Sequence, residues 1–456
     1  MKLRRLIPLL AAASLALPMA ACSPSPSASG AGAVAGSSAS GTVNWWTWDE
    51  KQAESYKQCL PEFEKQNPGV TVKISQYAVD DYFTKLTAGF VAGTAPDAFQ
   101  NSVQFFDAYA RQGQLEPLDD YVKQDNYDLG EFNVGVSAWK YTDGKQYGLP
   151  LDWAASAIYY NEDLVKKAGL KDSDIQNLDW STADGGTFDK VVAHLTIDSN
   201  GIRGDQPGFD KAHVATYGSG LLGTNDFIGQ TTWDSFVTTA GWTRGDKDAW
   251  PTKFNYDDPN FIKTMDYVRS LSDRGFAPKP GEFTIGDTEQ LASGKVALTT
   301  GGSWSATTFA KLPGVSVGIA PTVKGPDGKR SAMSNSNGNQ IYAGSKNKAA
   351  AWKWISFMGS EKCQTEASTH SGSFFPSIPG AMDAFAASQK TQGVDLQVFV
   401  DAAKNKEIYP AGPYANGSEM GTTLQPMFEA FFSHERNDDV FAEMAKKSGS
   451  PDLSVG

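Results

Sequence analysis

The chain has few of the residues that build metal and redox sites, with 4 His and 3 Cys among 456 residues. Side chains so few and so scattered do not form a dedicated zinc site, and we expect no cofactor. The hydrolase signatures Gly-x-Ser-x-Gly and His-Glu-x-x-His do not occur either. Positive charge is also scarce, because 40 Lys and Arg stand against 52 Asp and Glu, for a formal net charge of −12. This balance leaves no basic patch for nucleic acid, which we exclude as a partner.

The N-terminus has the pattern of an export signal. Residues 1–21 begin with a basic segment, continue as an apolar run and end in small residues directly before Cys22. The apolar run is too short to favour a membrane-spanning helix of about 20 residues. The order Leu-Pro-Met-Ala-Ala-Cys at 17–22 resembles the cleavage box of bacterial lipoproteins, in which the Cys is lipidated and becomes the mature N-terminus. We therefore expect lipidation of Cys22, and ordinary secretion with a free Cys22 is the alternative.

The segment from Cys22 to residue 42 has the composition of a flexible tether. It consists almost entirely of Ser, Pro, Ala and Gly, which offer little apolar surface to bury. Removal of residues 1–21 would take away three positive charges and change the formal net charge from −12 to −15. The length that remains suggests two domains or more. The sequence thus predicts a lipid-anchored protein on the extracellular face of a bacterial cell membrane.

The chain after the tether alternates between strands and helices. Strands are predicted at residues 42–49, 70–74 and 98–100, and helices at 50–67, 82–92 and 103–111. Pro61 is expected to kink the first of these helices. This order implies a largely parallel sheet, with binding loops at the carboxyl ends of its strands. Trp48 and Asp49 should therefore share one rim with Asn101 and Gln104.

Residues 147–161 look like a crossing between two bodies. Pro150 fixes an extended backbone, and the apolar and β-branched residues after it predict a strand. One unit of strands and helices precedes this strand and another follows it, so the strand would carry the chain from one lobe to the next. A cleft between two lobes is a common place for a ligand. Asp152 and Trp153 lie in the crossing and are candidate ligand contacts.

The second half continues the alternation. Helices are predicted at residues 188–195, 259–274, 288–293, 348–359, 419–432 and 438–447, and strands at 295–300 and 315–319. Gly302, Ser303 and Trp304 follow the first of these strands. A bare backbone, a hydroxyl and a large ring in this order suit a polyol ligand. Trp233 stands among Gly, Thr and Asp in a Trp-rich stretch and is a further candidate for the cleft.

Four motifs in the first half are typical of one family. They are Asn-Pro-Gly-Val at 67–70, Ala-Gly-Thr-Ala-Pro-Asp at 92–97, Gly-Gln-Leu-Glu-Pro-Leu at 113–118 and Gly-Lys-Gln-Tyr-Gly-Leu-Pro at 144–150. In this order they resemble the extracellular solute-binding proteins of ABC importers, and among these the maltose-binding-protein-like group that binds carbohydrates. The similarity continues at 159–164 and 292–298, so it covers nearly the whole chain after the tether.

The resemblance implies an α/β two-lobe periplasmic-binding-protein fold with three inter-lobe crossings and a ligand cleft at the hinge. A polar run at 333–339 then becomes the second crossing, and residues 407–414 look like the third. These segments add Asn337 and Tyr414 to the candidate ligand contacts. The predicted lobes are discontinuous, with residues 43–152 and 336–408 in the first and residues 153–335 and 409–456 in the second.

We predict that the protein captures a carbohydrate by hinge closure and hands it to the membrane permease of an ABC importer. Carboxylates and amides can pair with vicinal hydroxyls, and a Trp face can stack on the C–H face of a sugar ring. The 12 Trp, 16 Tyr and 25 Phe residues point to an oligosaccharide. In the family an aromatic ring commonly enters the cleft where Trp304 stands. We expect a monomer that is not an enzyme. The predicted ligand contacts are Trp48, Asp49, Asn101, Gln104, Asp152, Trp153, Trp233, Gly302, Ser303, Trp304, Asn337 and Tyr414.

Other functions stay open at this point. A secreted glycoside hydrolase also needs aromatic residues and carboxylates, and two carboxyl groups roughly 5 to 10 Å apart could occur by chance among 52 acids. Its usual eightfold βα repeat, however, is not the order predicted for this chain. The same two-lobe fold could instead bind a peptide, or a polyamine held partly by Asp49, Glu50 and Asp152. A metal is the least favoured cargo because His is so scarce.

The sequence leaves two local features undecided. Cys59 and Cys363 both fall in the predicted first lobe, and a disulfide would persist outside the cell, but no geometry says whether they are bonded. The Asx-rich residues 198–205 resemble half of a calcium loop. The Gly and the terminal Glu of an EF-hand are out of place there, so a plain Asx-rich turn is the alternative, and we expect no metal site.

Overall fold

The computed structural model describes residues 39–223, 227–372 and 374–454. The strands of this part of the chain form one mixed sheet. Its main strand order is β2-β1-β3-β9-β4-β7-β6-β5, while β10 pairs with β9 and β8 pairs with β4. The predicted export signal, Cys22 and most of the tether lie outside the described residues. Within those residues every helix is too short or too polar to span a bilayer.

The strands are β1 (Gly41–Thr47), β2 (Val70–Gln76), β3 (Ala98–Ser102), β4 (Leu149–Asn161), β5 (Ile197–Asp198), β6 (Val214–Ser219), β7 (Val296–Gly302), β8 (Val317–Ala320), β9 (Ala332–Ile341) and β10 (Ile408–Pro410). The helices are α1 (Glu50–Lys57), α2 (Leu60–Gln66), α3 (Val79–Ala92), α4 (Val103–Arg111), α5 (Asp119–Asp125), α6 (Glu162–Lys167), α7 (Asp172–Gln176), α8 (Gly186–Leu195), α9 (Asp234–Thr239), α10 (Pro259–Asp273), α11 (Asp287–Ala292), α12 (Ala306–Ala310), α13 (Lys348–Met358), α14 (Glu361–Ser371), α15 (Pro379–Thr391), α16 (Gln397–Lys404), α17 (Gly417–Phe432) and α18 (Asp439–Ser448).

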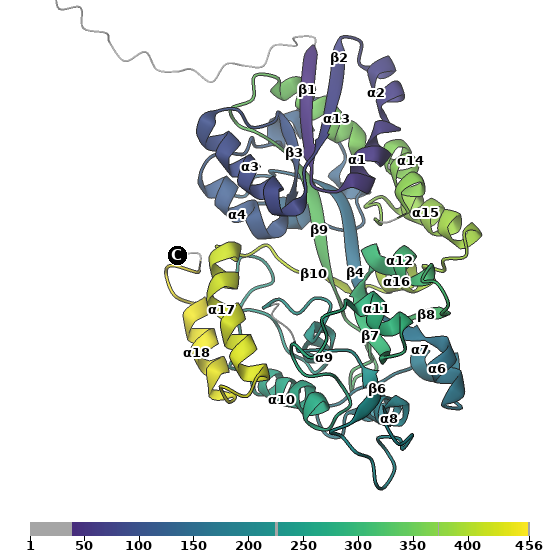
Figure 1. Cartoon of the computed structure of the whole chain (residues 1–456). Helices are drawn as coiled ribbons and strands as arrows, with labels where there is room; N and C mark the ends of the chain where they lie inside the picture. The colour runs from purple at the N-terminus through teal and green to yellow at the C-terminus, as the bar shows by residue number, and fades with distance from the viewer. Residues whose placement is uncertain (1–38, 224–226, 373, 455–456) are drawn as a thin grey trace, which may run out of the picture. The chain divides into compact units, whose positions relative to one another are not determined.

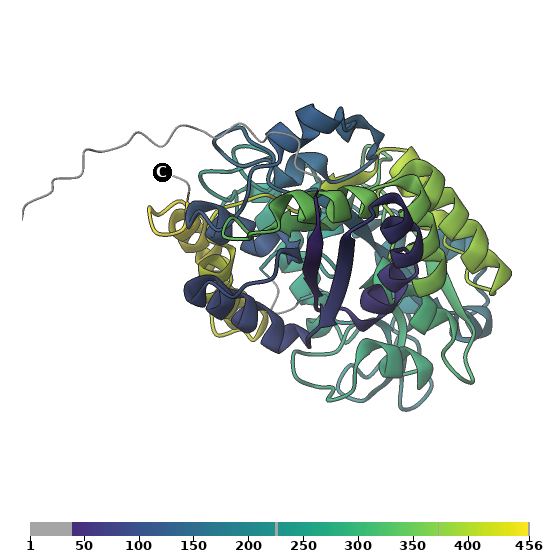
Figure 2. The same ribbon diagram turned by 90° about the horizontal axis from the view of Figure 1, so that it is seen from above.

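Strands β1, β2 and β3 pair in parallel, as the sequence predicts for the first half of the chain. Val43 and Trp45 point to one face, where α1, α2, α13 and α14 cover them. Phe99 points to the other face and packs with α3 and α4. Figures 1 and 2 show these helices on opposite sides of the β1–β2 pair. Because helices cover both faces of these strands, apolar residues point to either face.

Pro61 breaks the first predicted helix instead of kinking it. The structure has two helices, α1 ending at Lys57 and α2 beginning at Leu60 with Pro61 in its first turn. Proline fits a first turn because its missing N–H would have no helical partner there. The expectation of one continuous helix over 50–67 is therefore wrong.

Strand β4 is the crossing that the sequence predicts. Its residues from Leu149 to Ala155 pair with β9, and those from Ser156 to Asn161 pair with β7 and β8. All thirteen of its residues are buried. Strand β10 joins β9 in parallel at the same place, so the three crossing segments lie side by side (Figure 1). The fold is thus the two-lobe α/β fold with three crossings.

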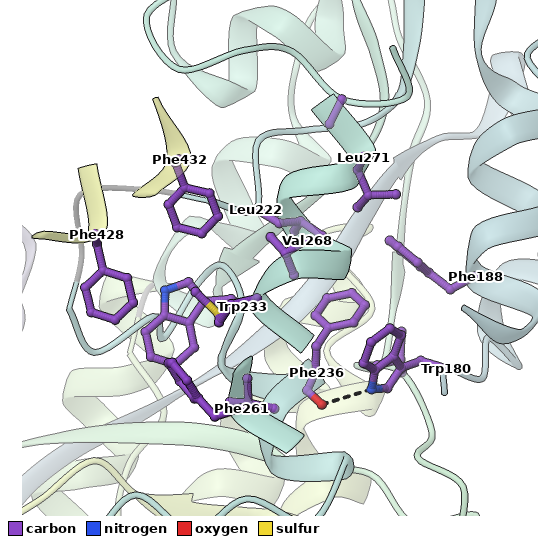
Figure 3. Close-up of a cluster of buried hydrophobic side chains, with 14 of the residues drawn as sticks. Trp180, Phe188, Leu222, Trp233, Phe236, Phe261, Val268, Leu271, Phe428 and Phe432 are labelled. Carbon is purple, nitrogen blue, oxygen red and sulfur yellow. Dashed lines mark hydrogen bonds between the residues drawn. The ribbon is translucent and has the colours of Figure 1, made fainter. Parts of the chain in front are cut away.

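The second half has a large aromatic core. Figure 3 shows Trp233 between Phe261 and Phe428, with Trp180 and Phe236 beside them. The indole Nε1 of Trp180 donates a hydrogen bond to the carbonyl oxygen of Phe236 at 2.9 Å. All five side chains are almost fully buried. Residues from α8, α9, α10, α17 and α18 meet in this cluster, so the C-terminal helices complete this half of the molecule.

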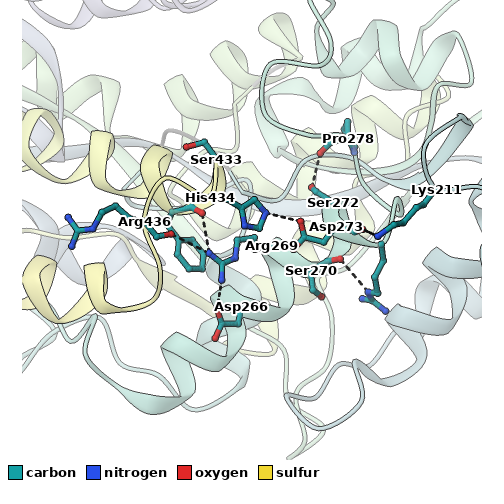
Figure 4. A network of polar contacts seen from close by, with 12 residues as sticks. Lys211, Asp266, Arg269, Ser270, Ser272, Asp273, Pro278, Ser433, His434 and Arg436 are labelled. Carbon is teal, nitrogen blue, oxygen red and sulfur yellow. Dashed lines mark hydrogen bonds and ion pairs between the residues drawn. The ribbon is translucent and has the colours of Figure 1, made fainter.

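A polar network fixes α10 against the turn between α17 and α18 (Figure 4). Arg269 pairs with Asp266 at 3.2 Å and also donates to the carbonyl oxygens of Phe431 and Arg436. The carboxylate of Asp273 lies 2.8 Å from His434 Nε2. These contacts hold the last two helices in place from the outside of the aromatic core.

A separate apolar cluster lies at the crossings. Trp153, Ala155 and Tyr159 of β4 pack in it with side chains of α15 and α16, and Phe309 of α12 stacks on Tyr159. Residues on both sides of the predicted boundary at 335–336 therefore meet in one cluster. The exact division of the chain between the two lobes stays a prediction.

A disulfide joins Cys59, the N-cap of α2, to Cys363 in α14, with 2.06 Å between the two sulfur atoms. The two residues are 304 positions apart in the sequence. The sequence left open whether Cys59 and Cys363 are bonded, and in the structure they are.

Replacing both Cys59 and Cys363 with Ser is expected to lower the free energy of unfolding by about 2–4 kcal/mol, because the bond restricts the unfolded chain by closing a long loop. Urea unfolding followed by circular dichroism, with and without dithiothreitol, measures the change. The reductant should bring the wild type to the midpoint of the variant and should leave the variant unchanged. A variant as stable as the oxidised wild type would contradict this expectation.

Candidate functional site

A cleft of about 530 Å³ lies where β1 and β3 end, beside β9. Loops at the carboxyl ends of two parallel strands form one wall, as the predicted strand order requires. Residues from the crossing strands and from the second half form the rest. The lining residues are Trp48, Asp49, Glu50, Lys51, Val79, Phe83, Ser102, Gln104, Phe105, Ala154, Trp304, Asn335, Asn337 and Phe374.

Asp49 is held in place by the start of α1. It is the N-cap of this helix, and its Oδ1 accepts a hydrogen bond from the backbone N–H of Gln52 at 2.8 Å. The backbone N–H of Asp49 in turn donates to Thr47 Oγ1 at 3.1 Å. Burial raises the pKa of Asp49 above its ordinary value. A capping carboxylate has further lone pairs, so Asp49 can still accept a hydrogen bond from a ligand hydroxyl.

Aromatic rings from two helices and one loop form an apolar wall of the cleft. Phe83 of α3 stacks on Phe105 of α4, with 3.9 Å between ring centroids. The indole of Trp48 lies 5.3 Å from Phe83 and 5.3 Å, edge-on, from Tyr82. Because Tyr82 is fully buried, it supports the partly exposed Trp48 from below. Such a wall suits the C–H faces of a ligand better than its hydroxyl groups.

Trp304 comes from the second half of the chain, directly after β7, and also lines the cleft. A β-carbon on Gly302 would come within 2.2 Å of the Trp304 ring. Only glycine therefore lets the indole lie flat against the end of the strand, and any other residue at 302 would displace it. Gly302 acts through Trp304 and does not itself line the cleft.

Asp152 lies beneath the cleft in a hydrogen-bonded group. Asn337 Nδ2 donates to its Oδ1 at 2.9 Å, and Gln52 Nε2 donates to its Oδ2. The Asp152 side chain is 2% exposed. Burial raises its pKa to about 7, although both hydrogen bonds oppose the shift. Asn337 lines the cleft while Asp152 does not, so Asp152 orients Asn337 from below.

The structure brings together five of the predicted ligand contacts, Trp48, Asp49, Gln104, Trp304 and Asn337. It places others just behind the surface of the cleft. Asn101 is fully buried, and its Nδ2 donates to Gln340 Oε1 at 2.7 Å. Ser303 is 4% exposed, and its Oγ accepts a hydrogen bond from the backbone N–H of Ala155 at 3.3 Å.

Three aromatic candidates lie away from the cleft. Trp153 is fully buried, packs against the tilted ring of Phe375 and donates from Nε1 to the carbonyl oxygen of Pro376 at 2.9 Å. Trp233 is fully buried in the core of the second half. Tyr414 is 2% exposed and packs against Phe227 and Phe254. In this structure all three side chains pack against protein groups and none lines the cleft.

Several cleft residues carried no signal in the sequence. Phe83 and Phe105 have the spacing of ordinary apolar positions in two predicted amphipathic helices, and Val79 precedes the helix predicted at 82–92, yet all three line the cleft. Ala154 and Asn335 enter it because β4 and β9 run past each other. Phe374 lies between α14 and α15 in a stretch for which the sequence predicted no element. A helix that lines the cleft with one side and packs on the core with the other has apolar residues on both sides. Periodicity alone does not distinguish its cleft residues from its core residues.

The Asx-rich residues 198–205 form a turn around the buried carboxylate of Asp198. Its Oδ1 accepts hydrogen bonds from the backbone N–H groups of Asn200 and Ile202, and its Oδ2 accepts one from Asp210. These backbone hydrogen bonds lower the pKa of Asp198 despite its burial. Of the two interpretations, the observed contacts are those of an Asx turn.

Comparison with known proteins gives consistent results. The family model for bacterial extracellular solute-binding proteins matches residues 47–365. A protein of Brucella abortus (strain 2308) that is named as a binding protein is 28% identical over 316 residues, which are 68% of this chain and 69% of that protein. The maltodextrin-binding protein MdxE of Bacillus subtilis (strain 168) is 26% identical over 364 residues, or 79% of this chain and 77% of that protein. The crystal structure of UspC from M. tuberculosis has a TM-score of 0.73 at 26% identity, and the match covers 90% of this chain and 99% of that one.

Proposed function

Because the chain belongs to the bacterial extracellular solute-binding protein family, we propose that it captures a carbohydrate in the cleft and delivers it to the membrane permease of an ABC importer. One observation carries the choice of ligand. Trp48 and Trp304, which are far apart in the sequence, line a single cleft together with Asp49, Gln104 and Asn337. The name of the relative MdxE supports the same class of ligand.

The chemistry of the cleft suits a neutral sugar. Asp49 accepts hydrogen bonds, and the amides of Gln104 and Asn337 both donate and accept them, as vicinal hydroxyls require. Trp48 and Trp304 offer ring faces to the C–H faces of a pyranose. A volume of about 530 Å³ lies in the usual range for ligand pockets, and the number of rings in its walls favours an oligosaccharide over a monosaccharide.

Hinge closure supplies the mechanism. A sugar that touches residues of both halves binds the closed arrangement more tightly than the open one, so it shifts the population toward closure. Asn335 and Asn337 of β9 lie at the crossings and also line the cleft. A ligand that binds Asn335 and Asn337 therefore contacts the crossing strands themselves.

Replacing Trp304 with Ala is expected to weaken binding of the cognate sugar by about 10- to 100-fold, because a buried aromatic ring is the kind of contact on which binding energy concentrates. Once a glycan array has identified the sugar, isothermal titration calorimetry measures the change. Trp250→Ala is an unsuitable control because this ring packs between the halves, whereas Phe357→Ala removes a half-buried ring far from the cleft. An affinity for the Trp304→Ala variant within twofold of the wild type would refute the role of the ring.

An enzyme would use the same kinds of residues, and the cleft holds the carboxylates of Asp49 and Glu50. Incubation with oligosaccharide mixtures, followed by product analysis, separates the two functions. A rise in melting temperature without shorter products supports a binding protein. Release of shorter sugars would support a glycoside hydrolase. A melting shift with putrescine or peptides, and none with sugars, would replace the carbohydrate with that cargo.

We also propose that the protein acts as a monomer tethered through lipid on Cys22. Mass spectrometry of the protein from the membrane fraction should find a lipid mass on Cys22. Cys22→Ala should release the protein without changing its affinity for sugar. An unmodified Cys22 in fully processed protein would favour ordinary secretion.

A further inference from the structure

A second pocket, of about 550 Å³, lies around the third crossing. It is as large as the sugar cleft, but among the described residues the two sets of lining residues have no member in common. The loop that contains Trp242 and Arg244 forms one wall, and the segment from Lys406 through β10 to Tyr414 forms another. A ligand here would therefore contact other residues than a ligand in the cleft.

The lining of this pocket is rich in positive charge, in a chain whose formal net charge is −12. Arg244, Lys247, Arg330 and Lys406 line it, against the acids Asp248 and Glu407. Within the part of the chain that the structure describes, neither Lys247 nor Lys406 forms an ion pair, and both are exposed. These two ammonium groups are therefore available to a ligand.

Among the described residues Arg330 forms no close ion pair, and Glu407 is the acid that attracts its charge. Its guanidinium donates to two backbone carbonyl oxygens, those of Thr322 and, at 2.7 Å, Gln176. Carbonyl oxygens satisfy hydrogen bonds without neutralising a charge. The nearby carboxyl of Glu407 is the acid that most directly faces Arg330.

Arg244 has donor groups to spare. Its side chain is only 11% exposed, and its Nη2 pairs with Asp234 Oδ1 at 2.9 Å. The Tyr409 hydroxyl and the Ile228 carbonyl oxygen are further partners of the guanidinium, while among the described residues its Nε and Nη1 make no well-formed hydrogen bond. Buried donors without a partner are rare in native proteins and call for an explanation, of which a small rearrangement around a bound acceptor is one. The guanidinium lies 5.8 Å from the centre of the Trp242 ring, so a charged and an apolar surface meet in the pocket.

We propose that this pocket binds a small organic anion, with its carboxylate or phosphate group near Arg244, Lys247 and Lys406 and its carbon skeleton against Trp242 and Tyr409. Arginine and lysine donors make strong hydrogen bonds to such groups because both partners are charged. An organic anion fits this pocket better than an inorganic ion, because an inorganic ion has no apolar part to bury against the aromatic side chains. The site is separate from the sugar cleft and does not rest on the proposed transport function.

Calorimetric titration of the full chain tests this proposal, at one fixed ionic strength because salt screens the attraction. The probes are citrate for the carboxylate arm and glucose 6-phosphate for the phosphate arm, with glucose as the uncharged match of the latter. The double variant Lys247→Gln/Lys406→Gln should bind the recognised anion at least tenfold more weakly than the wild type. The matched control Lys57→Gln/Lys390→Gln removes two exposed lysines elsewhere and should bind it normally.

Several results would overturn the proposal. One is the absence of binding by both anions up to 10 mM, roughly the weakest affinity of interest for a small ligand. Equal losses in the two double variants would show a general effect of charge. Undiminished binding of glucose 6-phosphate in Lys247→Gln/Lys406→Gln, or equal binding of glucose, would place the ligand in the sugar cleft instead. None of these results bears on whether neutral oligosaccharides bind the cleft.

Discussion

Replacing Trp233 with Ala is expected to lower the free energy of unfolding by about 3–5 kcal/mol, the usual effect of deleting a large aromatic side chain from a core. Trp233 is fully buried and contacts Phe428 with near-parallel rings whose centroids are 5.4 Å apart. Phe261 packs edge-on at 5.5 Å. The cavity left by Ala would therefore be lined by rigid rings that cannot collapse into it. Chemical denaturation followed by circular dichroism measures the loss.

The same variant separates packing from ligand binding. Because Trp233 does not line the cleft, the sugar affinity of Trp233→Ala should stay within twofold of the wild type at a temperature where the variant is folded. Trp233→Phe fills most of the space and should lose less stability, which keeps the comparison usable if the Ala variant fails to fold. A large loss of affinity in Trp233→Phe, with little loss of stability, would return Trp233 to the list of ligand contacts.

The contribution of Asp152 to the stability of the wild type is expected to fall between about pH 4 and pH 7. Its pKa is raised from 3.8 in the unfolded chain to about 7 in the folded protein. Over this range the folded state keeps a proton that the unfolded state has released, so a rise in pH favours unfolding. At 1.36 kcal/mol for each pKa unit, the effect of this one group reaches roughly 4 kcal/mol.

Other carboxyl groups titrate in the same range, so a pair of variants isolates this effect. Asp152→Asn cannot ionise, and its stability relative to the wild type should rise from about pH 4 to pH 7 and level off above that range. Asp395→Asn removes an exposed carboxyl group and should run parallel to the wild type. Urea unfolding at each pH gives both differences. Parallel curves for Asp152→Asn and the wild type would mean that Asp152 stays ionised in the folded protein.

Local patterns predicted the elements of this fold well. The helix expected at 103–111 is α4 within the same limits, and the one expected at 259–274 is α10, which ends one residue earlier. The crossing expected at 147–161 is β4, Leu149–Asn161. These segments have strong periodicity or a proline that fixes the backbone, so their structure depends little on distant residues.

The candidate site was harder to predict because exposure depends on the whole fold. Trp48 and Trp304 line the cleft, whereas Trp153 and Trp233 are buried. Trp48 and Trp304 follow the ends of strands, Trp233 lies in a polar stretch and Trp153 lies within β4, and none of these local settings decides whether the ring is exposed. Whether a Trp ring is buried or lines the cleft depends on which distant segment of the chain covers it. Phe375 covers Trp153, and the helices α10 and α17 cover Trp233.

The region between residues 359 and 407 had no predicted elements, yet it contains α14, α15 and α16. Helices α14 and α15 have many small residues and weak contrast between their faces, whereas α16 is short but amphipathic. Their place is fixed by the disulfide at Cys363 and by packing against the apolar face of β4. Neither is a local property of the sequence.

The complete burial of β4 limits how the two halves can move. Its backbone is paired to β9 over the first half and to β7 and β8 over the second, so separating it would break backbone hydrogen bonds to several neighbours at once. Amide protons of such a strand exchange with solvent only in rare, large openings. In the proposed hinge closure the halves would therefore rotate through small torsions shared among many linked peptide units. The backbone that would transmit the motion is also the backbone that unfolds least readily.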